Sequence, residues 1–205
     1  EVLKNYSDQL VDLQGKVDLV AGGPPCQGFS MAGKRVKDDV RNQLVFSYIK
    51  FIKLVQPKMV LFENVKGFTY AFNKKKKEGV EPYSQIVINA LEGLGYAIKP
   101  HVIDFSEYGV PQRRKRFILV GVKEGLCSPD KFEQLLKKNR DAFLAERGLS
   151  TTVTLQEAIS DLLRSNGELP TPDRKGFNSG KYGKRKLTAY EKLMRGDYPL
   201  SLIHL

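Results

Sequence analysis

The chain has 205 residues, enough for one domain with a sizeable hydrophobic core. It contains 34 Lys and Arg residues against 23 Asp and Glu residues, so the formal net charge is +11, and 41% hydrophobic residues exclude a disordered chain. No apolar run reaches the roughly 20 residues of a membrane helix. Two cysteines and two histidines exclude a disulfide scaffold and a metal-ligand cluster. We therefore expect a basic, cytoplasmic, monomeric protein without a membrane segment or a metal.

The positive charge predicts a polyanionic partner such as nucleic acid, and a basic surface without function is the alternative. The lysine run 74–77 is typical of a solvated loop. The basic residues 113–116 instead lead directly into the apolar run 117–120, a predicted strand. Charges held at the start of a core strand can contact a fixed target.

Strand-like and helix-like segments alternate over the first 125 residues. The segment up to Gly15 fits the end of a helix or a loop, and the strand 17–21 stops at a rigid Gly-Gly-Pro-Pro turn. The other expected elements are helix 43–55, strand 59–62, helix 83–94 and strands 96–105 and 117–122. This order is typical of an α/β domain with a mostly parallel sheet, to which the last two strands add an antiparallel hairpin at one edge.

The pattern changes after Gly125. Helices are predicted over 132–147, over 154–163 with Thr154 as N-cap, and over 188–195. Between them, residues 165–183 are rich in Gly, Pro, Asn and basic residues, which predicts a loop or a poorly ordered stretch. We expect an α/β domain over 1–125, a helical extension over 126–164 and a flexible basic segment over 165–205.

Three groups of reactive side chains follow or precede the expected strands, where an open α/β sheet binds its ligands. They are residues 24–30 (Pro-Pro-Cys-Gln-Gly-Phe-Ser), 63–65 (Glu-Asn-Val) and 112–116 (Gln-Arg-Arg-Lys-Arg). Each residue alone has an ordinary explanation, because a free cysteine is usually a buried apolar group and Glu63 can be a surface carboxylate. A thiol, a carboxylate and guanidiniums converging on one rim form a candidate catalytic site.

Taken in order, these three motifs resemble the DNA cytosine-5 methyltransferases. Residues 108–116 (Tyr-Gly-Val-Pro-Gln-Arg-Arg-Lys-Arg) and the helix-like segment 154–162 extend the resemblance, which covers about residues 18–163. It implies a Rossmann-like fold that uses S-adenosylmethionine, here incomplete at both ends. The cofactor-binding N-terminal strands are expected to be missing from residues 1–125, and the target-recognition region to begin within residues 165–205.

The resemblance also implies a role for each catalytic residue. Cys26, as a thiolate, adds to carbon 6 of a flipped-out cytosine, because carbon 5 becomes nucleophilic only after that addition. Glu63 hydrogen-bonds or protonates ring nitrogen 3, a role expected to require burial of the carboxyl. Asn64 positions this segment, Arg116 holds the cytosine carbonyl oxygen, and Arg114 steadies Glu63 or a phosphate.

The remaining implied contacts are to the cofactor and to double-stranded DNA. Pro25 and Gly23 are the expected cofactor contacts, with Pro25 against the adenine ring. The expected DNA contacts are Gln27, Ser30, Arg41 and Gln112. The glycine-rich turn and ribose-binding acid of the family are not found before Cys26, so we expect this chain alone to bind the cofactor weakly and to be inactive.

Several alternatives remain open. A transfer-RNA cytosine-5 methyltransferase uses the same mechanism, although Gly28-Phe29-Ser30 favours DNA. A non-catalytic nucleic-acid-binding fragment of the same fold would not need a nucleophile. A thiol-redox function lacks a Cys-x-x-Cys pair. A bacterial restriction-modification enzyme acting at the nucleoid is the default expectation.

Overall fold

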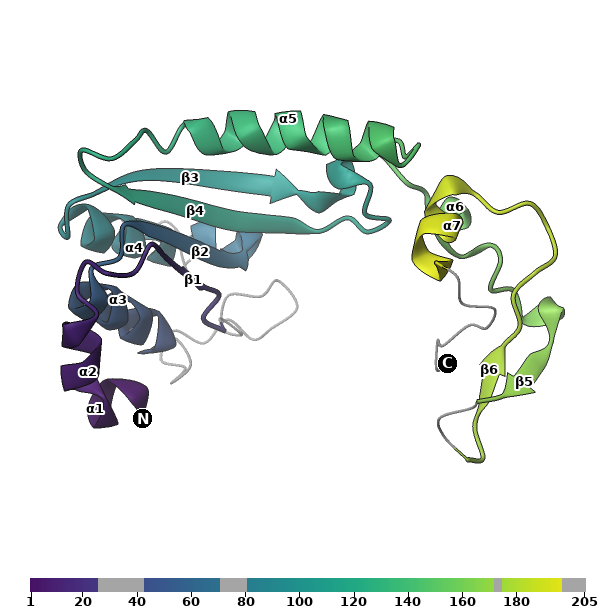
Figure 1. Cartoon of the computed structure of the whole chain (residues 1–205), viewed down its shortest axis with the longest axis horizontal. Helices are drawn as coiled ribbons and strands as arrows, with labels where there is room; N and C mark the ends of the chain where they lie inside the picture. Colours follow the sequence, from purple (N-terminus) through teal and green to yellow (C-terminus); the bar gives the residue numbers. More distant parts are fainter. Residues whose placement is uncertain (26–42, 71–80, 172–174, 197–205) are drawn as a thin grey trace. The chain divides into compact units, whose positions relative to one another are not determined.

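The computed structural model describes residues 1–25, 43–70, 81–171 and 175–196 (Figure 1). The chain divides into two compact units, Glu1–Ile103 with Lys115–Leu135, and Asp104–Arg114 with Leu136–Leu205. The lysine run 74–77 and four of the expected site residues lie outside the described residues: Cys26, Gln27, Ser30 and Arg41.

The first unit is built on a four-stranded sheet in the order β1-β2-β4-β3. Strand β1 (Leu19–Gly22) runs parallel to β2 (Met59–Val65), and β4 (Lys115–Lys123) runs antiparallel to β2. Strand β3 (Tyr96–Asp104) is next to β4 at the sheet edge, so the expected hairpin is present and its second strand lies inside the sheet. The predicted α/β class is confirmed, but the four described strands form a mixed sheet and not the mostly parallel one expected, because β4 runs antiparallel to β2.

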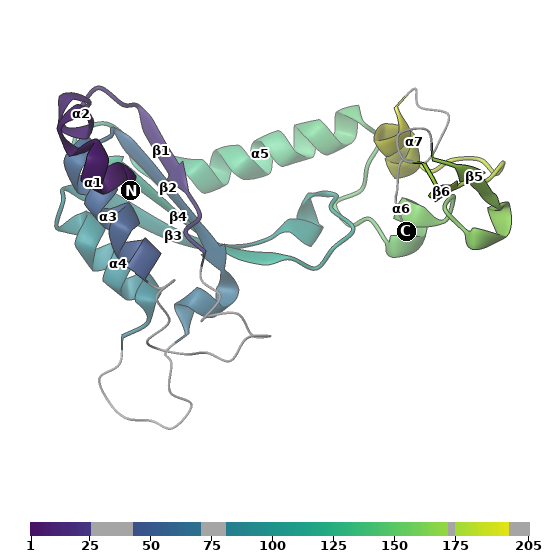
Figure 2. The same ribbon diagram turned by 90° about the horizontal axis from the view of Figure 1, so that it is seen from below.

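Helices α3 (Gln43–Val55) and α4 (Tyr83–Glu92) pack on one face of this sheet (Figures 1 and 2). Successive strand residues point to opposite faces, so Phe117 and Leu119 join this core while Ile118 and Val120 form a second cluster on the other face. The first core also contains Val45, Ile52, Val60, Phe62, Phe68, Val87, Leu91 and Tyr96. The chain before Gly15 forms two short helices, α1 (Val2–Asn5) and α2 (Ser7–Asp12), and α2 contacts α3.

Helix α5 (Lys131–Glu146) begins in the first unit and ends in the second. At its start, Phe132 packs against the Ile118 cluster and lies 5.5 Å from the ring of His101. The His101 Nδ1 atom is 3.6 Å from a carboxylate oxygen of Glu133. The predicted helix 132–147 is confirmed, and α5 begins and ends one residue earlier than predicted.

The second unit contains two helices that begin with the same capping motif. Thr154 caps α6 (Leu155–Ile159) and Thr188 caps α7 (Ala189–Arg195), each with a glutamate three residues later that bonds back to the cap. Helix α6 is shorter than predicted. It ends before Asp161, whose carbonyl accepts hydrogen bonds from Asn166 Nδ2 and the Gly183 amide, both at 2.8 Å, instead of continuing the helix.

The expectation of a loop throughout residues 165–183 is wrong. A short 3-10 turn, η5 (Arg164–Asn166), precedes β5 (Glu168–Pro170), which pairs antiparallel with β6 (Asn178–Gly180). Next to this hairpin, the buried hydroxyls of Thr171 and Ser179 lie 2.9 Å apart. Three-residue strands containing proline and glycine have too little alternation of apolar and polar residues to be recognised in the sequence.

Candidate active site

The carboxyl ends of β1 and β2 lie side by side because the two strands are parallel. Gly22 is opposite Phe62, so the next residues, Gly23 and Pro24, run beside Glu63 and Asn64. Cys26 follows Pro25 directly in the chain but lies outside the described residues. The described part of the site is therefore a strip of backbone leading to the thiol, with the Glu-Asn-Val segment next to it.

The Asn64 side chain joins the two strand ends. It is 3% exposed, its Nδ2 donates to the Pro24 carbonyl at 3.2 Å, and its Oδ1 accepts from the Val65 amide at 2.9 Å. Proline has no N–H and cannot continue a strand ladder. Asn64 thus supplies a cross-strand link just after β1 ends.

Glu63 forms an ion pair with Arg116 of β4, and Arg116 Nε lies 2.9 Å from Glu63 Oε1. The antiparallel register places Glu63 opposite Ile118, and Arg116 lies two residues before Ile118 in β4, on the same face. The Glu63 side chain is 40% exposed and that of Arg116 is 17% exposed. The carboxylate is therefore less buried than the sequence-based expectation required.

Gly23 leaves one side of this carboxylate open. A Cβ atom at this position would lie 3.0 Å from Glu63 Oε2 and 3.5 Å from the Glu63 carbonyl oxygen. The contact with Oε2 is closer than a normal van der Waals distance, whereas the contact with the carbonyl oxygen is an ordinary one. Any residue larger than glycine would therefore displace the Glu63 side chain.

The remaining motif residues lie on the segment before β4. Arg114 and Gln112 are exposed and belong to the second unit, and the Arg114 carbonyl accepts from the Phe105 amide at 3.0 Å. The resemblance implies that Arg114 steadies Glu63 or a nearby phosphate, and this stays a prediction. The guanidinium that the structure places on Glu63 is that of Arg116, which lies within β4.

Tyr48 is a residue of this region whose role the sequence did not indicate. Its hydroxyl lies 3.3 Å from the Val20 carbonyl of β1 and 3.2 Å from the Leu61 carbonyl of β2. Burial raises the pKa of this phenol, so the hydroxyl keeps its proton and remains a donor. Its ring lies against Gly22, where a Cβ would come within 2.6 Å of Tyr48 Cε2. In the sequence, Tyr48 was only one apolar position of an amphipathic helix.

Within the described ranges, no helix has the length and apolar character needed to cross a bilayer. Nor do three His, Cys, Asp or Glu side chains gather there as a metal-binding group.

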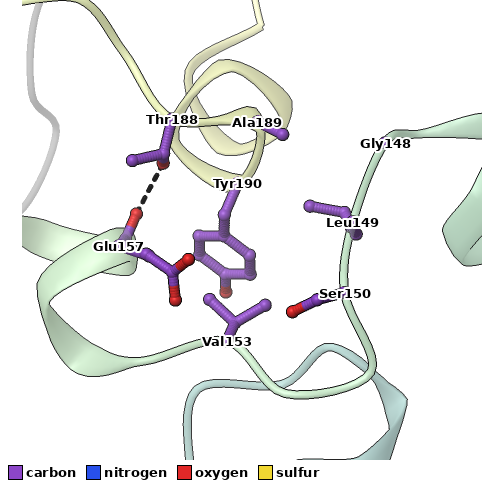
Figure 3. Close-up of a pocket in the computed structure, with 8 residues that line it drawn as sticks. All are labelled: Gly148, Leu149, Ser150, Val153, Glu157, Thr188, Ala189 and Tyr190. Carbon is purple, nitrogen blue, oxygen red and sulfur yellow. Dashed lines mark hydrogen bonds between the residues drawn. The ribbon is translucent and has the colours of Figure 1, made fainter.

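A small pocket of about 140 Å³ lies in the second unit between the chain after α5 and the starts of α6 and α7 (Figure 3). The Tyr190 ring, Val153 and Leu149 supply its apolar walls. Its main polar groups are already bonded to the protein, since Thr188 Oγ1 donates to the Glu157 carbonyl at 2.6 Å and the Glu157 carboxylate accepts from Thr154. The main polar groups of this pocket therefore serve to hold the starts of α6 and α7.

The profile of the C-5 cytosine-specific DNA methylases matches residues 3–199. The chain belongs to this family. The resemblance inferred from the three motifs is thereby confirmed.

Named relatives of this methylase chain are Type II methyltransferases. M.AgeI of Thalassovita gelatinovora is 34% identical over 203 residues, which is 95% of this chain and 45% of that protein. M.XorII of Xanthomonas oryzae pv. oryzae is 43% identical over 115 residues, 55% of this chain and 26% of that protein.

A solved structure supports the fold. It is a prophage-encoded protein of E. coli described as a DNA modification methyltransferase, with 29% identity and a TM-score of 0.51 over 86% of this chain and 44% of that one. The methylase chain described here thus spans less than half the length of M.AgeI and of this structure.

Proposed function

We propose that the protein to which this chain belongs methylates carbon 5 of cytosine in double-stranded DNA through a covalent adduct with Cys26. The observation that carries the proposal is the Glu63–Arg116 ion pair beside the Gly23–Pro25 strip, which leads directly into the thiol-bearing residue. Membership of the methylase family and the Type II methyltransferase relatives support DNA as the substrate in preference to transfer RNA.

In the proposed reaction, Cys26 forms a covalent bond to the base and later breaks it. The Cys26 thiolate adds to carbon 6 of a cytosine flipped out of the duplex, and the ring electrons move toward nitrogen 3. Glu63 hydrogen-bonds or protonates that nitrogen. A guanidinium has five N–H donors, so Arg116 can bind the cytosine carbonyl oxygen while it holds Glu63. After transfer to carbon 5, loss of the carbon 5 proton allows Cys26 to leave.

The methyl donor implied by the family is S-adenosylmethionine, which supplies an electrophilic methyl group when it is bound. The chain fits one edge of this ligand. Gly23 and Pro25 are exposed at the carboxyl end of β1, and Gly23 has no side chain to fill the space next to Glu63. We assign Pro25 to the adenine ring and Gly23 to close backbone approach.

We assign the DNA contacts by position in the motifs. Gln112 and Arg114 are exposed and precede β4, where they can reach the DNA backbone or the flipped nucleotide. Gln27, Ser30 and Arg41 follow Cys26 in the chain, and their assignment rests on the resemblance. Such contacts orient the DNA without selecting its sequence.

The adduct itself provides the test. The full-length protein is incubated with S-adenosylmethionine and duplex DNA containing 5-fluorocytosine, whose fluorine blocks release, and is then examined by denaturing gel electrophoresis. We expect a stable protein–DNA band for the native protein and none for Cys26→Ser. Cys127, an exposed free cysteine, provides the matched control, and Cys127→Ser should retain the band. A band that persists in Cys26→Ser would refute the assignment, and adducts formed only with transfer RNA would favour the other substrate.

The close approach of Gly23 to the Glu63 carboxylate leads to a second prediction. Gly23→Ala should push the carboxylate away from Arg116 and lower kcat about tenfold or more, because small misplacements of catalytic groups are costly. Steady-state methylation measures this effect. Gly180→Ala is the control, since a Cβ there would meet no atom within 4 Å. Unchanged kcat in Gly23→Ala would show that Glu63 adjusts freely.

A further inference from the structure

Two consecutive glycines at the end of β1 are enclosed by side chains from opposite faces of the sheet. A Cβ atom at Gly22 would lie 2.6 Å from Cε2 of Tyr48, which reaches the sheet from α3. A Cβ atom at Gly23 would lie 3.0 Å from Oε2 of Glu63 on β2. Successive residues of an extended chain point to opposite faces. The Tyr48 ring and the Glu63 carboxylate therefore contact the Gly22-Gly23 segment from opposite sides.

The Tyr48 ring is held in place by α3 and by the core. Val45 and Ile52, one helical turn before and after Tyr48, are fully buried in the core cluster against which Tyr48 packs. The ring of Phe62 meets the Tyr48 ring edge-on, with centroids 5.4 Å apart. Close packing of this kind leaves a side chain few alternative rotamers. The ring is therefore a rigid support for the backbone of Gly22.

The Tyr48 hydroxyl links β1 to β2 directly. It lies 3.3 Å from the Val20 carbonyl oxygen and 3.2 Å from the Leu61 carbonyl oxygen. A phenol has one proton, so the hydroxyl shares it between these two acceptors. The ladder between the strands has four residue pairs, residues 19–22 against 59–62. Tyr48 thus adds a link from outside the ladder, close to the point where the ladder ends.

The Glu63 carboxylate is bounded on both of its oxygens. Arg116 Nε lies 2.9 Å from Oε1, and the backbone at Gly23 closes the space next to Oε2. A displacement of the Gly22-Gly23 segment would remove the second boundary. We propose that Tyr48 is a positioning residue for methyl transfer, which supports this segment from the α3 side and thereby fixes the Glu63 carboxylate. The inference rests on the proposed function and adds to it a residue outside the three motifs.

Tyr96 provides a matched control in the same core. It is 1% exposed, and its hydroxyl donates to the Pro57 carbonyl at 2.6 Å. Pro57 precedes the first residue of β2, whereas Glu63 lies near the end of this strand. Tyr96→Phe therefore removes the same kind of hydrogen bond, a buried one from a phenol to a backbone carbonyl, at the other end of β2.

Steady-state methylation by the full-length protein tests the proposal. Tyr48→Phe keeps the ring but loses the hydroxyl contacts, and Tyr48→Leu loses the ring as well. We expect kcat to fall about tenfold in Tyr48→Phe and about 100-fold in Tyr48→Leu, because a misplacement of about 1 Å can cost on the order of 10²-fold. The KM for DNA should not change. Tyr96→Phe should lower the melting temperature at least as much as Tyr48→Phe does, yet keep the native kcat.

A double-mutant cycle tests the contact between the ring and Gly22. Gly22→Ala brings a methyl group against the Tyr48 ring and should lower kcat by itself. In Tyr48→Leu the ring is absent, so the additional change Gly22→Ala should lower kcat by a clearly smaller factor than it does in the native protein. Equal factors in the two backgrounds would contradict the proposal.

The variants separate the role of Tyr48 from the proposed function. Native kcat in Tyr48→Phe would overturn the role, because a loss confined to Tyr48→Leu is also what a cavity in the core produces. An equal loss of kcat in Tyr96→Phe, or a change in KM alone, would overturn it too. With any of these results, a native protein that forms the 5-fluorocytosine adduct keeps the proposed function. A native protein that forms no adduct refutes that function itself.

Discussion

Replacing Glu63 by glutamine is expected to lower kcat for DNA methylation about 10²- to 10⁴-fold, the usual contribution of a positioned acid or base. Glutamine keeps the size of the side chain but cannot donate a proton to ring nitrogen 3 as an acid, and it loses its charge toward Arg116. The measurement is methyl transfer from labelled S-adenosylmethionine by the full-length protein, with DNA affinity determined separately.

The matched control for this variant is Glu92→Gln at the end of α4, an exposed carboxylate remote in sequence from the motifs. It should methylate like the native protein. Arg116→Lys provides a second comparison, because it retains the charge but loses the guanidinium geometry that reaches both Glu63 and a carbonyl oxygen. A Glu63→Gln protein with more than half of native kcat would remove Glu63 from the chemical step.

The second large effect is expected on stability, at Glu191 of α7. Its side chain is fully buried and accepts from the Thr188 amide at 2.9 Å, the Asp161 amide at 3.1 Å and Ser160 Oγ at 3.2 Å, and it is paired with Arg185. Glu191→Ala would leave these donors unsatisfied. Each buried donor left unsatisfied costs about 1–3 kcal/mol of the free energy of unfolding. Urea unfolding, with hydrogen exchange over residues 155–195, measures and localises the loss.

Glu157 provides the control for this variant, because it occupies the same position in the capping box of α6 but is exposed. Glu157→Ala should destabilise the protein clearly less. Equal losses would mean that capping alone, and not the buried network, stabilises the second unit. The neighbouring pair of Asp161 and Arg195, at 2.9 Å and with Arg195 stacked 3.6 Å over the Tyr182 ring, is part of that network.

The same network makes stability depend on pH. Burial by itself would raise the pKa of Glu191, but the hydrogen bonds from Thr188 and Ser160 and the charge of Arg185 outweigh it, and the pKa is lowered from its usual value of 4.5. The stabilisation is therefore complete above about pH 4.5 and is lost as the pH falls toward the folded-state pKa. Melting temperatures at pH 7 and pH 4 should differ less in Glu191→Ala than in the native protein.

The elements of the first unit were largely predictable from the sequence because each has a strong local pattern. The helical periodicity of residues 43–55 and the apolar runs that became β2 and β4 appear close to their predicted bounds. The second unit was less predictable. Its hairpin and its helix ends depend on polar bonds between segments distant in the chain, such as that from the Gly183 amide to the Asp161 carbonyl.

The sequence by itself determined the family, because a thiol, an acid and paired guanidiniums in a fixed order reflect the chemical demands of one reaction. Only the tertiary structure decided that Arg116 pairs with Glu63, since this depends on the register of β4 against β2. It likewise assigned Tyr48 to the join between β1 and β2. Motifs record which chemical groups a reaction needs, whereas strand register and packing determine which groups meet.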